Sequence, residues 1–274
     1  MQPPICARHG KPVRNTQLAT FFLCDDCCEE LSRLACRGEP PVFREFDLIG
    51  FCGLCNESRC VKLTQWYLCE DCQRVINSYR LGRVAAEYAL QQWNTLVTPS
   101  VPHIYLKQVD IVQPQQYERR RKREPAKQLD FLAVERASGQ PLFWLELKTG
   151  RNALSDMRTF QLDKSDCDDV LNVVKVTGLP ALLCHVCVAQ EFQPPTSRFI
   201  GAGIWWTDIF AMRDSFIEIR RRRFDSGKEA AHFAPTCFRE LNVLAKMLSQ
   251  GYHFALQWRL AREGIPKLYR ETKR

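Results

Sequence analysis

The 274-residue sequence predicts an α/β protein with a small cysteine-rich module ahead of it. Two observations support this prediction. Segments with helical and strand periodicity alternate between residues 79 and 209. Ten of the fourteen cysteines lie before residue 73. We therefore expect a tandem metal-binding module over residues 1–76, with repeats at about 1–36 and 46–76, and a larger domain over residues 77–274.

The larger domain begins with an amphipathic helix over residues 79–94. One apolar stripe at helical spacing predicts it: Tyr79, Ala86, Ala89, Leu90 and Trp93. Residues 104–112 alternate as a first strand does, and the prolines between residues 98 and 128 predict extended pieces and turns.

Two apolar runs, residues 129–135 and 142–148, are joined by a short segment that contains Gly and Pro. This pattern predicts a β-hairpin. Alternate side chains of a strand share one face, so Glu146 and Lys148 are neighbours, and the hairpin partner can bring Asp130 beside Glu146.

Two carboxylates beside an ammonium suit a Mg²⁺-dependent phosphodiesterase. Mg²⁺ takes one or two carboxylates and leaves its other positions to water and phosphate oxygens. Lys148 would hold the attacking water or stabilise the developing charge. The alternative is a surface hairpin with a cross-strand ion pair, but the run around Glu146 is too apolar for an exposed strand.

The next elements are a turn and strand over residues 178–190 and a strand within 198–209. Cys184 and His185 point to opposite faces of the first of these strands, so buried cysteines explain them better than a metal site. A C-terminal helix over residues 238–264 carries a stripe that predicts core packing or a dimer face: Leu241, Leu244, Met247 and Leu248.

Residues 78–210 resemble the PD-(D/E)xK nuclease superfamily through Asp130, Glu146 and Lys148. The resemblance implies a restriction-endonuclease-like fold, with a mixed sheet flanked by helices, and cleavage that leaves a 5′-phosphate. It also implies a helper carboxylate in the first helix, which Glu87 matches; a surface pair with Arg83 is the alternative.

Many members of that superfamily carry a Gln in the helix after the lysine, and Gln161 is the match here. Lys164 follows as a candidate phosphate contact. Ser165 stands where the helicase-linked exonuclease branch has Tyr, which disfavours that branch. A solvated, capped helix start is the alternative account of this segment.

The N-terminal cysteines form two sets with zinc-ligand spacing. The first set is Cys6, His9, Cys24 and Cys27, and the second is Cys52, Cys55, Cys69 and Cys72. Residues 23–34 and 68–79 are similar at an offset of 45, each with a Cys-x-x-Cys pair ahead of a helix-like segment, as in treble-clef or ribbon folds. We expect two structural Zn²⁺ ions, with Cys28 or Cys36 as possible substitute ligands in the first set.

A disulfide framework is the alternative, and it needs an oxidising compartment. The first residues lack the apolar stretch of a leader peptide, and no apolar run approaches membrane-spanning length. We therefore expect a cytoplasmic protein without a membrane segment.

Positive charge is concentrated in the larger domain. Residues 1–76 hold nine Lys or Arg and ten Asp or Glu, which gives a net charge of −1. Because the whole chain has a net charge of +8, residues 77–274 carry +9. Dense runs occur at 119–123 and 220–223, and the candidate phosphate contacts there are Arg119, Arg120, Arg121, Lys122, Arg123, Arg221 and Arg222. Solvated loops are the alternative.

These features predict a Mg²⁺- or Mn²⁺-dependent nuclease acting on DNA, with RNA as another possible substrate. Restriction or phage defence, mobile-element processing, and junction resolution or repair are the biological roles that fit. The competing hypothesis is a DNA- or protein-binding adaptor in which the zinc repeats act and the nuclease-like core is inert.

Overall fold

The structure is a computed structural model. It describes residues 4–7, 9–13, 18–34, 42–109, 129–193, 196–221 and 228–252. The chain divides into two compact units. The first holds the described residues up to Val84 together with Ala189–Ile200, and the second holds the described residues from Ala85 to Val109, from 129 to Val188, and from Gly201 onward.

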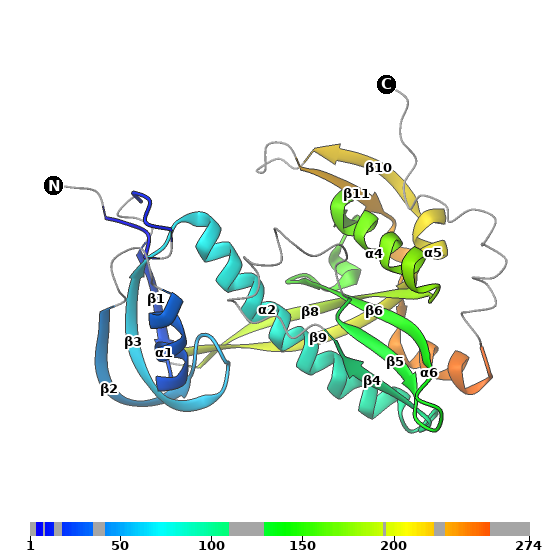
Figure 1. The fold of residues 1–274 in the computed structure, drawn as a ribbon, viewed down its shortest axis with the longest axis horizontal. Coiled ribbons are helices and arrows are strands. Elements are labelled where there is room, and N and C mark those ends of the chain that lie inside the picture. The colour runs from blue at the N-terminus through cyan, green and yellow to red at the C-terminus, as the bar shows by residue number, and fades with distance from the viewer. Residues whose placement is uncertain are drawn as a thin grey trace. The chain divides into compact units, whose positions relative to one another are not determined.

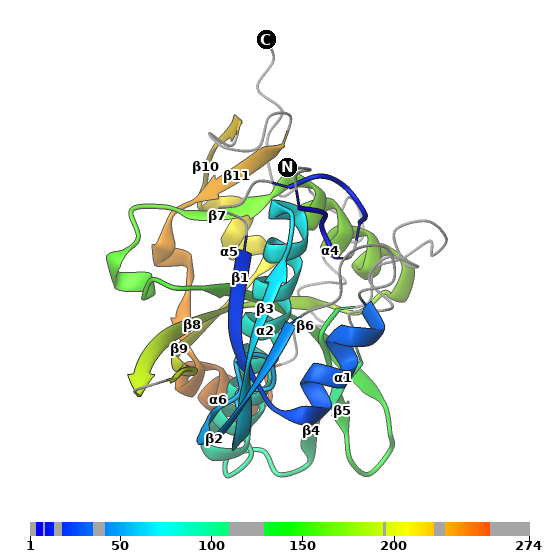
Figure 2. The ribbon, with the colours of Figure 1, turned by 90° about the vertical axis from the view of Figure 1, so that its left-hand side faces the viewer.

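The first unit is built on a three-stranded antiparallel sheet of order β1-β3-β2 (Figure 2). Its elements are β1 (Leu18–Leu23), α1 (Asp25–Leu34), β2 (Val42–Phe51), β3 (Ser58–Tyr67) and the start of α2 (Glu70–Gln92). Both helices begin just after a cysteine and carry two acidic residues in the first turn, where the helix dipole favours negative charge. The predicted boundary at residue 76 falls inside α2, which is continuous through it.

The second unit contains most of a six-stranded mixed sheet of order β12-β9-β8-β6-β5-β4. The strands are β4 (Ile104–Gln108), β5 (Phe131–Glu135), β6 (Pro141–Gly150), β8 (Ala181–Gln193), β9 (Thr196–Asp208) and β12 (Arg239–Glu240). β4, β5 and β6 are antiparallel, and β6 is parallel to β8. Such a sheet with helices around it confirms the predicted α/β fold class.

The remaining elements of the second unit form a small antiparallel sheet, helices and short helical turns. They are η2 (Trp93–Val97), η3 (Leu154–Asp156), β7 (Phe160–Asp163), α4 (Lys164–Thr177), α5 (Ile209–Asp214), β10 (Phe216–Arg221), β11 (Glu229–Phe233), η4 (Pro235–Cys237) and α6 (Leu241–Ser249). The small sheet has the order β10-β11-β7. Figure 1 shows α4 and the β10–β11 hairpin on one side of the large sheet.

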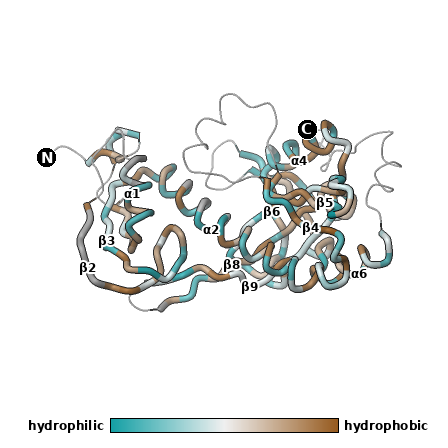
Figure 3. Tube along the Cα trace, turned by 60° about the horizontal axis from the view of Figure 1, so that its bottom comes forward, coloured by the Kyte–Doolittle hydropathy of each residue, from teal (hydrophilic) through white to brown (hydrophobic). Residues whose placement is uncertain are grey.

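Apolar side chains cover both faces of the large sheet. On one face, Leu183 packs in a cluster with buried residues of α4, α5, β7 and β11. On the other face, the Phe143 ring lies 6.4 Å from that of Trp93 in η2. Because both faces are covered, residues 181–188 of β8 are all buried, and their sequence is apolar almost without interruption. Figure 3 shows hydrophobic and hydrophilic stretches alternating along α2, which is amphipathic as expected.

The structure corrects one expectation about the periphery, because Gln161 lies on strand β7 and not in a helix. Arg220 and Arg221 end strand β10. The C-terminal stripe contributes to the core of this chain, since Leu241, Leu244 and Leu248 are buried.

Several candidate residues lie outside the described part of the chain: Arg119, Arg120, Arg121, Lys122, Arg123, Arg222 and Cys36. Among the residues that the structure does describe, no helix combines the length and the apolar character that crossing a membrane requires.

Candidate active site and metal centres

The predicted hairpin forms and brings the first two acids together. Phe131 pairs with Leu145, so Asp130, which directly precedes β5, lies opposite Glu146. The backbone N–H of Leu147 donates to Oδ2 of Asp130 at 2.6 Å. This hydrogen bond fixes the Asp130 carboxylate against the strand that carries Glu146.

Lys148 lies between two carboxylates. Its Nζ is 2.9 Å from Oε1 of Glu146 and 2.8 Å from Oδ2 of Asp166. Glu146 is only 2% exposed. Burial alone would lower the pKa of Lys148, but the two carboxylates outweigh it and hold the pKa above its ordinary value. Between these two carboxylates Lys148 is held as an ammonium, which can stabilise negative charge.

The sequence reasoning missed Asp166. This residue lies in the first turn of α4, the helix that packs its apolar side over the face of the sheet bearing Lys148. The signal was present, because residues 163–169 contain four aspartates around a helix start. Nothing local in that pattern shows which aspartate reaches the lysine.

A buried histidine adjoins the lysine in the neighbouring strand. The parallel register of β6 and β8 pairs Lys148 with His185. The His185 ring stacks on Trp205 and its Nε2 lies 3.1 Å from the carbonyl oxygen of Asn152. Burial lowers the pKa of His185, so the ring is neutral and Nε2–H donates to that carbonyl.

Gly150 makes room for this histidine. A Cβ atom at Gly150 would lie 2.7 Å from Cε1 of His185, closer than real Cβ contacts allow. The glycine that ends β6 therefore permits the imidazole to pack beside the strand that carries the acids and the lysine.

The other candidate residues of the larger domain occupy more peripheral positions. Glu87 is exposed on α2, and Gln161 is exposed on β7, opposite His232 of β11. Lys164 begins α4 and its Nζ is 3.5 Å from a carboxylate oxygen of Glu229. Arg221 is exposed at the end of β10.

The first unit contains two groups of possible metal ligands. We call Cys6, His9, Cys69 and Cys72 the outer cluster, and Cys24, Cys27, Cys52 and Cys55 the inner cluster. Within each, the ligand atoms all lie within 4.8 Å of one another. The two clusters contain all eight predicted residues, but the predicted grouping is wrong. The pair Cys6 and His9 lies with Cys69 and Cys72, and the pair Cys24 and Cys27 lies with Cys52 and Cys55.

The antiparallel pairing of β1 with β3 explains this grouping. Leu18 pairs with Tyr67 and Leu23 with Lys62. The pair that follows β1 therefore lies where β3 begins, and the pair that follows β3 lies where β1 begins. Backbone hydrogen bonds fix both ends, from Ala7 N–H to the carbonyl of Tyr67 and from Gly53 N–H to that of Phe22.

The sulfur separations fit a tetrahedral ion. Sγ of Cys6 is 3.7 Å from Sγ of Cys72, and Sγ of Cys24 is 3.8 Å from Sγ of Cys55. Four ligands at about 2.3 Å from Zn²⁺ have edges of about 3.8 Å, whereas a disulfide brings its sulfurs to about 2.05 Å. In the outer cluster Nδ1 of His9 lies 3.3 Å from Sγ of Cys69 and 3.7 Å from Sγ of Cys72, so Nδ1 is placed as the fourth ligand.

Backbone amides approach the sulfurs of both clusters. The N–H of Cys24 donates to Sγ of Cys52 at 3.3 Å, and that of Cys69 donates to Sγ of Cys6 at 3.4 Å. Such bonds favour the thiolate, which is the form that binds metal. In Cys52 a bond from the Cys27 thiol, together with the backbone amides of Cys24, Leu54 and Cys55, outweighs burial and lowers the pKa to about 4.

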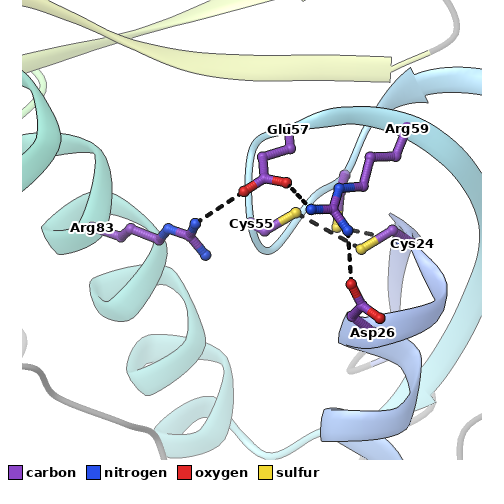
Figure 4. A network of polar contacts seen from close by, with 7 residues as sticks. Cys24, Asp26, Cys55, Glu57, Arg59 and Arg83 are labelled. Carbon is purple, nitrogen blue, oxygen red and sulfur yellow. Dashed lines mark hydrogen bonds and ion pairs between the residues drawn. The ribbon is translucent and has the colours of Figure 1, made fainter.

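The loop of the inner cluster binds further segments of the first unit. Asn56, which has a left-handed φ of 62°, exchanges two side-chain hydrogen bonds with the backbone of Phe199, at 2.7 and 2.8 Å. Glu57 lies between Arg59 and Arg83, and Arg59 also pairs with Asp26 (Figure 4). The inner cluster is thus linked to the start of β9 and to α2.

Comparison with known proteins gives little beyond this geometry. No family model matches the chain, and no curated protein matches it. Similar solved structures include a Holliday junction resolvase from Archaeoglobus fulgidus and a nuclease from a fusselovirus. The first is 10% identical, covers 60% of this chain and 98% of its own, and has a TM-score of 0.33. The second is 12% identical, covers 61% and 88%, and has a TM-score of 0.32.

Proposed function

We propose that this protein is a Mg²⁺- or Mn²⁺-dependent nuclease that hydrolyses DNA phosphodiester bonds. The arrangement of Asp130, Glu146 and Lys148 on the β5–β6 hairpin carries the proposal. A nearly inaccessible glutamate in contact with a lysine is costly in a fold that needs neither, so a chemical task accounts best for both.

The donor set fits a hard cation, because two carboxylates from adjacent strands are the protein share that Mg²⁺ usually takes. Asp130 and Glu146 would hold the ion, which would polarise the phosphodiester and lower the pKa of a bound water. Lys148 would orient that water and stabilise the charge on the phosphate oxygens. The water oxygen would bond to phosphorus as the P–O3′ bond breaks, leaving a 5′-phosphate and a 3′-hydroxyl. Glu87 and Gln161 remain proposed helpers.

Charge supports a polyanionic substrate. The sequence beyond residue 76 carries +9, and a basic surface beside a phosphodiesterase site favours nucleic acid. Among the described candidates, Lys164 and Arg221 would contact phosphates, and the run at residues 119–123 would add to them. DNA is the proposed substrate, and single strands with each sugar would expose a preference for RNA.

The two clusters are proposed as structural Zn²⁺ sites, because four protein ligands close each one. Cysteines free of disulfides among the described residues accord with a reducing compartment such as the cytoplasm. The module, which is near neutral over residues 1–76, would contact a protein partner or a few base edges instead of supplying general phosphate affinity.

A plasmid-nicking assay with Mg²⁺ or Mn²⁺ at low salt tests the nuclease proposal. Wild type and Lys175→Ala, which removes an exposed lysine of α4, should convert supercoiled DNA, whereas Lys148→Ala should not. Equal cutting by Lys148→Ala would refute the site. If wild type cuts neither plasmid nor branched DNA, the adaptor hypothesis replaces the enzyme.

A further inference from the structure

Lys148 has two acidic partners with different origins. Glu146 lies two residues away on the same strand, while Asp166 comes from α4. Of these two carboxylates, only Glu146 faces Asp130 across the hairpin. A cation held by Asp130 and Glu146 would therefore compete with the ammonium of Lys148 for the same glutamate.

Asp166 is not placed as a third ligand of that cation. In the part of the chain that the structure describes, the two cysteine clusters are the only groups of three or more Cys, His, Asp or Glu side chains whose donor atoms all lie within 4.8 Å. Asp130, Glu146 and Asp166 do not form such a group. Asp166 contacts Nζ of Lys148 instead, at 2.8 Å.

We propose that Asp166 is a positioning residue, which holds the Lys148 ammonium in place when the catalytic cation takes the Glu146 carboxylate. This inference rests on the proposed nuclease function. It assigns the two acids separate tasks: Glu146 binds the ion, and Asp166 keeps Lys148 directed at the substrate.

The helix that carries Asp166 is suited to this task. Its neighbours on the inner side of α4, Cys167, Val170 and Val174, are buried in the core, so the first turn is fixed relative to the sheet. A lysine stem has four rotatable bonds and loses considerable freedom when it is held in one position. A carboxylate on a packed helix supplies that restraint without occupying the metal site.

Cleavage rates at saturating Mn²⁺ test the inference through a double-mutant cycle. Asp166→Asn should slow cleavage on the order of 100-fold, the scale of a misplaced group near reacting atoms, and Asp166→Glu should restore most of the rate. In a Lys148→Met background, Asp166→Asn should have no further effect. A further loss of tenfold or more in that background would overturn the proposal, because Asp166 would then act independently of the lysine.

Asp168→Asn is the matched control, since it removes the same charge from an exposed position of the same helix. It should leave the rate within about twofold of wild type. A loss equal to that of Asp166→Asn would show that net charge, and not contact with Lys148, is responsible, and would overturn the inference.

A second measurement does not depend on turnover. NMR of the lysine ammonium groups, with Ca²⁺ in place of the catalytic ion, should show a slowly exchanging Lys148 signal in wild type that is lost in Asp166→Asn. Persistence of that signal in the variant would overturn the inference. Mn²⁺ binding that disappears in Glu146→Gln checks the proposed function separately, so the two proposals can fail independently.

Discussion

The two units of this protein use buried polar groups in opposite ways. In the first unit, cysteines make up nearly half of the buried cluster, beside a small set of apolar side chains. In the second, a large cluster of aliphatic and aromatic residues forms the core, and the buried polar residues include Glu146, His185 and His232. The polar atoms thus determine the fold of the first unit, whereas in the second they are carried by a fold that apolar packing determines.

The largest effect that we expect is the unfolding of the first unit when zinc is removed. Chelation should unfold the first unit, since zinc binding to such modules is worth on the order of 10 kcal/mol and is coupled to folding. Hydrogen exchange should then lose protection in β1, β3 and residues 196–200, while β6 and β8 up to Val188 remain protected. Metal analysis should find two zinc ions per chain.

Single substitutions provide the matched comparison. Cys55→Ser should remove one zinc ion, whereas Cys60→Ser should retain both, because Cys60 is exposed and belongs to neither cluster. If β1 and β3 stay protected without metal, the apolar residues alone sustain the unit and the contrast between the regions disappears.

In the second unit, replacing the buried acid Glu146 should affect activity and leave the fold intact. Glu146→Gln should lower the cleavage rate on the order of a thousandfold, about 4 kcal/mol of transition-state stabilisation. The zinc content should remain at two, and the second unit should remain folded by circular dichroism. Loss of zinc in this variant would show that the site and the module are not separable.

Gly150→Ala should have an intermediate effect on stability. The added methyl group meets His185, and overpacking of this kind costs about 1–3 kcal/mol. Urea denaturation should show the loss. Combining it with His185→Ala should relieve most of the clash relative to the single variant; an unchanged penalty would mean that the strain arises elsewhere.

The smallest expected effect concerns Thr196, the first residue of β9, in the part of that strand that belongs to the first unit. Thr196→Val removes the hydroxyl that accepts a hydrogen bond from Phe51 N–H at 3.0 Å, while its shape is kept. The cost should be about 1 kcal/mol. Faster exchange of the Phe51 amide, with no change in zinc content, is the measurement; an unaltered exchange rate would contradict the role of this bond.

The sequence predicted best where the interactions are local. The hairpin that places Asp130 opposite Glu146 spans a short turn, and alternation alone fixes which side chains share a face. The ligand types were predictable for the same reason, because each pair lies within four consecutive residues. The predicted β5–β6 hairpin is present in the structure.

Long-range pairing limited the rest. The grouping of the cysteine pairs depends on the register of β1 with β3, which joins residues 39 to 49 positions apart. The choice of Asp166 among four aspartates depends on where α4 packs. Gln161 was assigned to a helix through the resemblance to the nuclease superfamily, and the strand of residues 160–163 is too short to show a clear period against that assignment.

The nesting of the two clusters has a consequence for the order in which the chain takes up metal. The inner cluster joins residues 31 positions apart, whereas the outer one joins residues 66 apart. Doubling a loop costs about 0.6 kcal/mol of closure entropy, and closing the inner loop first shortens the outer one. All four inner ligands also leave the ribosome before Cys69 and Cys72. The first zinc ion should therefore enter at Cys24, Cys27, Cys52 and Cys55, and the second should complete a loop that the first has already drawn together.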